Sequence, residues 1–174
     1  MKSVFGSLFI VSTPLGNLKD ITLRALDIMK NSYLIAAEDT RKSQILLKEY
    51  KIKTKMISYH EYNSQNRIET IIAHLKDGKN ISLISDAGTP GISDPSYRLI
   101  RSAIENEITV SSIPGPSAFL TALTSSGLPT DNFFFAGFLP TKKGRNSKLE
   151  ELSKLNSTLI LYENPKRLLK TLND

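Results

Sequence analysis

The chain has 174 residues, of which 40% are hydrophobic and 23% charged, so its composition excludes a disordered protein and allows one or two domains with real cores. The absence of cysteine excludes disulfides and thiol chemistry, and the absence of any run of about 18 apolar residues excludes a membrane span. A net charge of +6 suggests a partner that carries phosphates, although many basic proteins are merely soluble. The lack of cysteine also fits a cytoplasmic location.

The first apolar stretch, Leu8 to Ser12, predicts a buried strand. Its apolar run is short, is preceded by Gly6 and Ser7, and is followed by no small-residue cleavage site, so a strand is favoured over a signal peptide. A helix is predicted over residues 20–30, where Ile21, Leu26 and Ile28 give a rough apolar face. Two further strands are predicted at residues 33–37 and 55–59.

A second helix is predicted over residues 64–78, ended by Gly78, and a fourth strand over residues 81–85. The next helix is predicted to start with Asp94 as its N-cap and Pro95 at its first position. A fifth strand at residues 108–113 runs into a helix that ends at Gly127. The apolar faces of the two helices that flank the fourth strand are expected to consist of Ile68, Ile71, Ile72 and Leu75, and of Leu99, Ile100, Ala103 and Ile104.

This alternation of strands and helices predicts an α/β fold with a mostly parallel, helix-covered sheet in a first domain, residues 1–126. The segment 127–132 is interpreted as a linker into a second domain, residues 127–174. That domain is predicted to contain a strand near residues 133–140, a basic loop, a helix, a strand near residues 157–163 and a final helix. It is short for burying a sheet, so it is expected to be incomplete.

The usual signatures of α/β enzymes are absent from the sequence. It contains no phosphate-binding P-loop, no G-x-G-x-x-G fingerprint and no G-x-S-x-G nucleophile elbow. His60 and His74 are too far apart in sequence for a helical metal-binding pair, so no metal site is predicted.

Four loops rich in glycine, proline and polar residues follow the predicted strands instead. They comprise residues 13–20, 38–43, 86–95 and 114–118. Open α/β sheets bind ligands at the carboxyl ends of their strands, and prolines pre-order a loop and so lower the entropic cost of binding. Each loop alone could be a tight turn, but four of them at one sheet edge predict the wall of a pocket.

The motifs of these loops carry a resemblance. The stretches "STPLGNLKDIT", "IAAEDTR", "SDAGTPGISDP", "PGPSAFLTALTSSGLP" and "FAGFLP" occur in this order between Leu8 and Tyr162. In this combination the chain closely resembles the 2′-O-ribose methyltransferases of small-subunit ribosomal RNA, which belong to the tetrapyrrole methylase family of S-adenosylmethionine enzymes. The family continues beyond the segment present here.

The resemblance implies a two-domain tetrapyrrole methylase fold, with helices on both faces of the first sheet. It implies S-adenosylmethionine as methyl donor and a cytidine ribose of 16S rRNA near the decoding centre as acceptor. The 16S rRNA or the small ribosomal subunit would be the partner, and the enzyme would be a homodimer. The donor-binding residues carried over by motif are Pro14, Asp86, Gly88, Ile92, Asp94, Ser117, Ala118 and Tyr162.

Two alternatives to this activity stay open at this point. A family member of this kind could act on a small tetrapyrrole or another acceptor. The chain could also be an RNA-binding fragment without catalysis.

Methylation of a ribose hydroxyl needs a group that takes up the proton, and a positioned carboxylate can serve as this base. Glu38 and Asp39 lie at the end of a predicted strand beside Arg41, which suggests a base and a phosphate clamp. In the alternative interpretation, Asp39 caps the next helix and Arg41 pairs with it.

The basic loop of the second domain is a candidate for RNA binding, because phosphate contacts from Lys and Arg bind without reading sequence. The residues concerned are Lys142, Lys143, Arg145 and Lys148. A solvated surface is the alternative interpretation of such a run.

Overall fold

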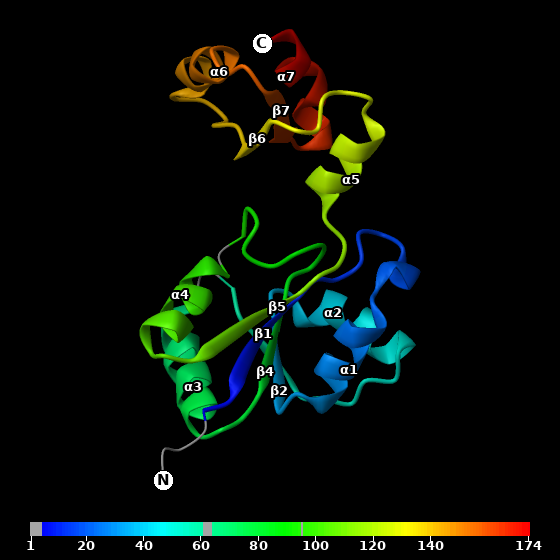
Figure 1. Cartoon of the computed structure of the whole chain (residues 1–174), viewed down its shortest axis with the longest axis vertical. Coiled ribbons are helices and arrows are strands. Elements are labelled where there is room, and N and C mark those ends of the chain that lie inside the picture. Colours follow the sequence, from blue (N-terminus) through cyan, green and yellow to red (C-terminus); the bar gives the residue numbers. More distant parts are fainter. Residues whose placement is uncertain (1–4, 61–63, 95) are drawn as a thin grey trace. The chain divides into compact units, whose positions relative to one another are not determined.

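The computed structural model describes residues 5–60, 64–94 and 96–174. The chain divides into two compact units, Met1–Ser117 and Ala118–Asp174 (Figure 1). Among the described residues, every helix is too short or too polar to cross a membrane.

The first unit is built on a parallel sheet of strands in the order β3-β2-β4-β1-β5. Each strand predicted from the sequence is confirmed to within about one residue at either end. The strands are β1 (Ser7–Val11), β2 (Leu34–Ala37), β3 (Met56–Ser58), β4 (Ile81–Ile84) and β5 (Thr109–Ile113).

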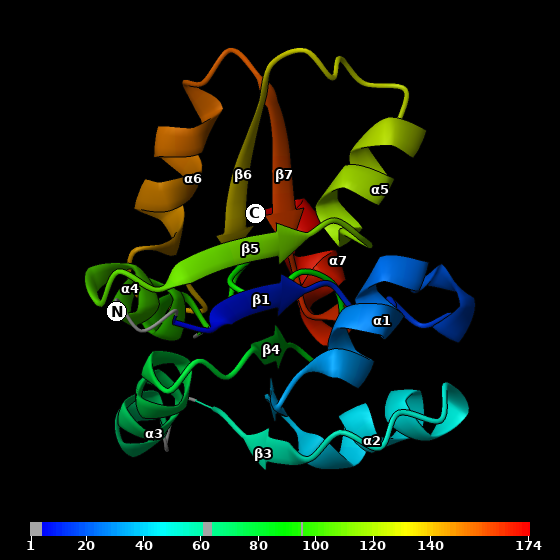
Figure 2. The ribbon, with the colours of Figure 1, turned by 60° about the horizontal axis from the view of Figure 1, so that its bottom comes forward.

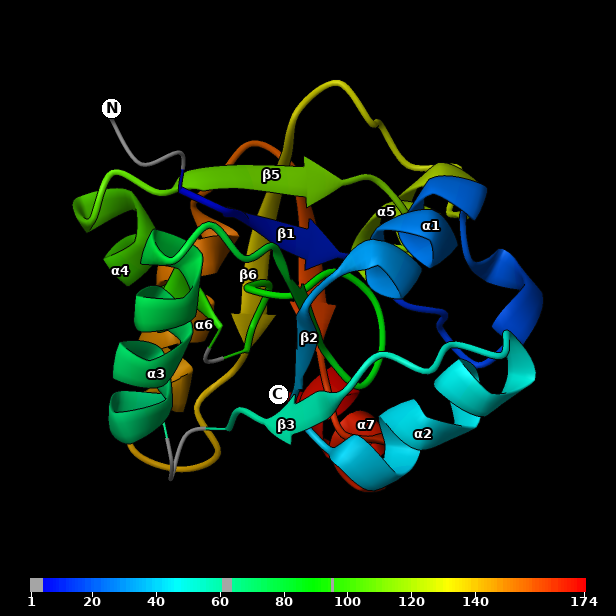
Figure 3. The same ribbon diagram turned by 90° about the horizontal axis from the view of Figure 1, so that it is seen from below.

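Helices cover both faces of this sheet, as predicted. α1 and α2 lie on one face, and α3 and α4 lie on the other (Figures 2 and 3). The helical segments of the unit are η1 (Leu18–Asp20), α1 (Leu23–Asn31), α2 (Thr40–Glu49), α3 (Ser64–Lys76) and α4 (Tyr97–Glu105).

The alternation of side chains along β1 divides the core into two clusters. Leu8 and Ile10 pack with residues of α3 and α4, such as Ile71 and Leu99. Val11 belongs to the second cluster, with residues of α1 and α2. Because successive side chains of a strand point to opposite faces, a central strand with helices on both sides must be apolar throughout.

Helix α4 differs from the prediction at its start and on its apolar face. It begins at Tyr97, and Asp94 accepts a hydrogen bond from the backbone N–H of Ser96 at 2.6 Å. Asp94 therefore closes a turn just before the helix rather than capping its first residue, and Pro95 lies outside the described residues. Ile104 was expected in the core but is 61% exposed, because its side of the helix faces a surface hollow rather than the sheet.

The second unit contains a two-stranded parallel sheet and the helices around it. Its elements are α5 (Ala118–Ser125), β6 (Phe133–Phe138), α6 (Arg145–Ser153), β7 (Thr158–Tyr162), η3 (Pro165–Arg167) and α7 (Leu168–Asn173). The pairing of β6 with β7 shifts by one position between Phe135 and Gly137.

Helix α5 belongs to the second unit, whereas the sequence placed the division at residues 126/127. The physical reason is aromatic packing. The ring of Phe119 stacks on Phe135 of β6 with centroids 4.8 Å apart, and Phe135 meets Tyr162 of β7 edge to face at 4.9 Å. The Pro and Gly residues after α5 resemble a linker, but apolar contacts rather than loop composition decide which unit a helix joins.

Arg145 is the buried polar centre of the second unit. Its guanidinium donates to Asp174 Oδ2 at 2.7 Å, to Thr171 Oγ1 at 2.7 Å and to the carbonyl oxygen of Pro140 at 3.1 Å. The carboxylate of Glu163 lies 3.7 Å from the same group. Arg145 thereby joins the ends of β6 and β7 to α6 and α7.

We expect Arg145→Met to destabilise the second unit by about 2 kcal/mol, the order of the loss of hydrogen bonds to charged groups. Lys148→Met is the matched control, because Lys148 also lies on α6 but makes a partly exposed pair with Glu151. Urea unfolding followed by circular dichroism measures both variants, since the chain has no tryptophan for fluorescence. Equal midpoints for the two would show that the buried cluster contributes nothing specific.

Candidate functional site

The loops at the carboxyl ends of β1 and β4 are held together by backbone pairing. The N–H of Thr13 donates to the carbonyl oxygen of Gly88 at 2.9 Å, and the N–H of Gly88 donates to that of Thr13 at 3.0 Å. The hydroxyl of Thr13 also donates to the carbonyl oxygen of Ser85 at 3.0 Å. Two loops whose paired residues are 75 positions apart in sequence are therefore fixed against each other before any ligand binds.

A chain of hydroxyl contacts extends this arrangement to the loop after β5. Ser12 Oγ and Thr89 Oγ1 are 2.9 Å apart, and Thr89 Oγ1 donates to the carbonyl oxygen of Pro116 at 3.1 Å. Ser12 Oγ additionally donates to Ile113 at 3.3 Å. Hydroxyls that bond across strand ends make a pre-ordered rim.

Asp86 connects the loop after β4 to the start of α2. One carboxylate oxygen accepts from the N–H of Asp39 at 3.0 Å, and the other pairs with Lys42 Nζ at 2.6 Å. The hydrogen bond to Asp86 raises the pKa of the Lys42 ammonium. Asp86 was predicted to surround the donor, and in the structure its two oxygens already hold the protein's own loops.

Glu38 directly follows β2 and is hydrogen-bonded to Asp86. Its Oε2 accepts a hydrogen bond from the N–H of Asp86 at 3.5 Å. Burial raises the pKa of the Glu38 carboxyl above its ordinary value of 4.5, and the nearby charges of Asp86 and Asp94 raise it further. A carboxylate with a raised pKa is a better proton acceptor near neutral pH than an ordinary one.

Asp39 and Arg41 adopt the alternative arrangement that the sequence left open. Asp39 Oδ1 accepts from the N–H of Arg41 at 2.9 Å and so caps α2, while the Arg41 guanidinium forms a two-pronged pair with the carboxylate at 2.9 and 3.1 Å. These hydrogen bonds lower the pKa of Asp39 to about 2. A carboxylate of such low basicity is a poor base, whereas the side chain of Arg41 is 90% exposed and open to a phosphate.

One carboxylate oxygen of Asp94 accepts no hydrogen bond from the described residues. Its Oδ1 bonds the N–H of Ser96, but its Oδ2 is buried and has no hydrogen-bond partner among the residues that the structure describes. A buried carboxylate oxygen without a partner is costly, so it indicates a missing ligand or an ordered water.

The other predicted donor residues of the first unit occupy different positions on this edge. Pro14 lines a small cavity between the loop after β1 and α2. Ile92 lines the larger hollow beside α4, about 790 Å³, and Ser117 is half-buried at the end of the unit. The N–H and C=O of Gly88 are both paired with Thr13 and fix the loop, and its predicted role toward the donor stays a prediction.

Two predicted donor residues lie in the second unit. Ala118 is exposed at the start of α5. Tyr162, at the end of β7, is half-buried, and its ring packs against Phe135 and Phe138. Its role toward the donor stays a prediction.

The four basic residues predicted to bind RNA separate into three kinds. Arg145 does not belong to the set, because it is 6% exposed and paired inside the second unit. Lys148 is half-buried and pairs with Glu151 at 2.7 Å. Lys142 and Lys143 are exposed, and within the described residues neither takes part in an ion pair. Only these two fit the prediction.

Lys42 and Ser43 line the small cavity. They belong to the segment 38–43 that was predicted as part of a pocket wall, but the sequence analysis named neither as a site residue. The signal that could have found them is their place one turn into the helix after "AAEDTR". A helix that starts at a strand's carboxyl end presents its first turn to the same edge.

The sequence of the chain is similar to a known protein family and to individual curated proteins. Residues 7–174 match the family model of tetrapyrrole (corrin/porphyrin) methylases. The chain is 52% identical over 167 residues to the ribosomal RNA small subunit methyltransferase I of Mesorhizobium japonicum, covering 95% of the chain and 57% of that protein. The protein of the same name from Escherichia coli O157:H7 is 49% identical over 170 residues, covering 97% and 59%. The chain thus spans less than two thirds of these relatives.

Solved structures of the same fold are more distant in sequence. A diphthine synthase aligns with a TM-score of 0.73 and 15% identity over 92% of the chain and 66% of that structure. The uroporphyrin III C-methyltransferase of Thermus thermophilus aligns with a TM-score of 0.64 and 15% identity, over 97% and 75%. At this identity the likeness shows the shared fold.

Proposed function

The chain belongs to the tetrapyrrole methylase family, and on this basis we propose that it transfers a methyl group from S-adenosylmethionine to RNA of the small ribosomal subunit. The acceptor is the 2′-hydroxyl of a cytidine in 16S rRNA near the decoding centre. The observation that carries the proposal is the identity of about half of all residues, over nearly the whole chain, with proteins named as small-subunit rRNA methyltransferases.

The residues at the sheet edge fit a cationic, hydroxyl-rich donor. The buried Oδ2 of Asp94, which has no partner among the described residues, is an acceptor for donor hydroxyl or amine groups, and Asp86 and Asp94 make the edge acidic. Asp94, Ile92 and Ser117 would hold S-adenosylmethionine. When bound, it supplies an electrophilic methyl group on a positively charged sulfur.

Glu38 is the group that takes up the proton of the acceptor hydroxyl. The pKa of Glu38 is raised, whereas that of Asp39 is lowered. Of these two acids, Glu38 is therefore the stronger base. The N–H of Asp86 holds one of its oxygens in place, and the exposed guanidinium of Arg41 can receive an RNA phosphate. A general base of this kind contributes roughly 10²–10⁴-fold to the rate.

The exposed Lys142 and Lys143 are proposed to contact RNA phosphates. Replacing both with Ala should flatten the dependence of log K on log salt by about 1.4, because each contact to single-stranded RNA contributes about 0.7. Filter binding of 16S rRNA fragments at several salt concentrations measures the slope. Lys148→Ala is the control, because Lys148 is already paired with Glu151 and should change the slope little. A double variant with the slope of the parent chain would remove these lysines from the RNA-binding surface.

Incubation with methyl-labelled donor and three acceptors tests the function. We expect label in small-subunit rRNA and none in large-subunit rRNA or in a tetrapyrrole. Label in the tetrapyrrole alone would reject the RNA substrate. This assay does not test three further predictions. They are that the protein is a homodimer, that it is cytoplasmic, and that its substrate is the assembled small subunit.

A further inference from the structure

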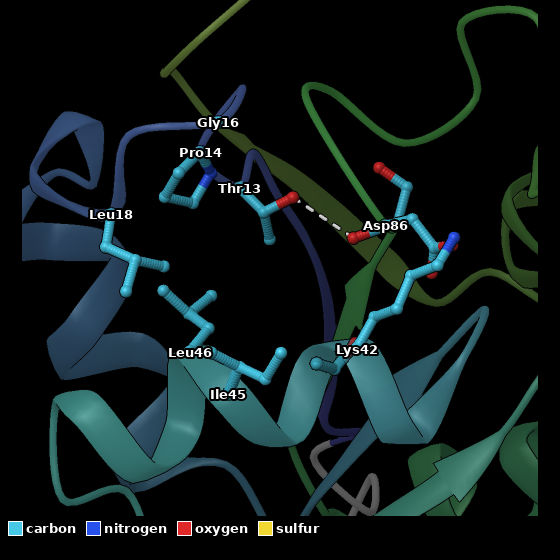
Figure 4. A pocket seen from close by; sticks show the side chains of 10 residues that line it. Thr13, Pro14, Gly16, Leu18, Lys42, Ile45, Leu46 and Asp86 are labelled. Carbon is cyan, nitrogen blue, oxygen red and sulfur yellow. Dashed lines mark hydrogen bonds and ion pairs between the residues drawn. The ribbon is translucent and has the colours of Figure 1, made fainter.

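A small cavity opens between the loop after β1, helix α2 and the end of β4 (Figure 4). Its volume is about 180 Å³. Apolar side chains gather on one side of it, and Thr13, Asp86 and Lys42 lie on the other. The apolar side consists of Pro14, Leu18, Ile45 and Leu46.

The cavity is lined by a buried hydroxyl that the protein does not use. Ser43 is 6% exposed, and its Oγ has no hydrogen-bond partner among the residues that the structure describes. The backbone N–H of Ser43 donates to Asp39 within α2, so helix formation accounts for the backbone but leaves the side chain unsatisfied. Buried hydroxyls in folded proteins are nearly always bonded to protein, water or ligand, so this one is an acceptor and donor that a water or the polar edge of a ligand can use.

The size of the cavity limits what it can hold. Sites for drug-sized ligands have volumes of roughly 300–1,000 Å³, so a cavity of about 180 Å³ is too small for a whole S-adenosylmethionine. It suits a single flat ring. Apolar walls would cover the faces of such a ring, and the Ser43 hydroxyl would meet a polar atom on its edge.

The rim of the cavity carries one cationic side chain, Lys42, beside the carboxylate of Asp86. Lys42 Nζ is paired with Asp86 but its side chain is 65% exposed, so it can also reach a phosphate outside the cavity. A ligand with a flat ring for the cavity and an anionic group for Lys42 at the rim has the chemistry of a nucleotide.

We propose that this cavity receives the unstacked base of the acceptor nucleotide, with Ser43 bonded to the base edge and Lys42 near its phosphate. The proposal rests on the proposed function, since that function makes RNA the acceptor. Proteins recognise single-stranded RNA by enclosing splayed bases and bonding their edges, and enzymes that act on one nucleotide commonly take it out of the stack. The cavity adjoins Glu38 through Asp86, so base binding there would position the ribose beside the proton acceptor.

Methyl NMR of the isoleucine and leucine side chains tests this directly with three probes. Cytidine 5′-monophosphate should shift the methyl signals of Leu18, Ile45 and Leu46, whereas ribose 5-phosphate, which lacks a base, should not. Equal shifts from both compounds would show a phosphate site only. Shifts of the same methyls by S-adenosylmethionine would assign the cavity to the donor. Either result overturns the proposal.

Two variants sharpen the test. Ser43→Ala should weaken cytidine monophosphate binding at least threefold without loss of folding stability, because the hydroxyl has no protein partner to lose. Ile45→Ala shortens a wall residue that is 63% exposed, so it should weaken binding and spare the core. Unchanged affinity in both variants contradicts the proposal. Methyl transfer to rRNA with no shift of these methyls would reject the base pocket alone, and shifts without any transfer would reject the proposed function alone.

Discussion

Glu38→Gln is expected to lower the rate of methyl transfer by about 10²–10⁴-fold, the usual contribution of a general base. The amide keeps the size of the side chain and an oxygen that can accept from the N–H of Asp86, but it cannot take up a proton. Donor affinity, measured by calorimetry, should stay within about twofold, because the variant removes a step in the reaction rather than a wall of the site.

Asp39→Asn is the matched control for this variant. Asparagine caps helices about as well as aspartate, so the start of α2 should persist while the pair with Arg41 weakens. We expect a rate within a few fold of the parent chain. A larger loss in Asp39→Asn than in Glu38→Gln would exchange the roles of the two acids.

The pH dependence of kcat/KM is a second, independent test of Glu38 as the base. Because Glu38 must be ionised to act, kcat/KM should rise with pH through its folded pKa, which burial places above 4.5. This acid limb should disappear in Glu38→Gln. A limb that persists in that variant would belong to another group.

Gly88→Leu is expected to lower donor affinity about 100-fold. Gly88 has a φ of +79°, and a Cβ there would lie 3.1 Å from the side chain of Leu15. Left-handed backbone costs a non-glycine residue about 1–2 kcal/mol, and each lost hydrogen bond to Thr13 costs about 0.5–1.5 kcal/mol. Since a factor of ten corresponds to about 1.4 kcal/mol, displacement of the two loops accounts for an effect of this size.

Gly127→Leu separates backbone strain from loop displacement. Gly127 has a similar φ of +74°, but nothing lies within 4 Å of its position for a Cβ. It should carry the same local strain and leave donor binding unchanged, with both variants retaining the parent's circular dichroism. Equal donor affinity in the two variants would show that the Thr13–Gly88 pairing does not shape the donor site.

Much of the first unit could be predicted from the sequence because its signals are local. Apolar runs such as Leu8 to Val11 are too short for helices and are bounded by Gly, Pro or polar residues. The strand order could not be predicted. It depends on which strands β3 and β4 join after their crossovers, and that choice is made by packing across the two core clusters.

The meeting of the polar loops at one sheet edge could be predicted, whereas the bonding partner of each side chain could not. A loop motif says that Asp39, Asp86 and Arg145 are polar and near an edge, but not which partner each one finds. Asp39 is taken by its own helix, Asp86 by Lys42, and Arg145 by a buried cluster whose members come from α7 and the end of β7. The partners of Asp86 and Arg145 are 44 and 26 residues away in sequence, so only the folded chain brings them together. The partner of Asp39 is two residues away, which is why the sequence could offer that pairing as an alternative.

The most direct test is to locate the methyl group. Small ribosomal subunits from cells that lack the modification are incubated with the chain and labelled S-adenosylmethionine, and their 16S rRNA is digested and analysed by mass spectrometry. We expect a single 2′-O-methylcytidine, recognised by its resistance to alkaline cleavage, in the decoding region. A methyl group on a base, or label confined to another RNA, would contradict the proposed reaction.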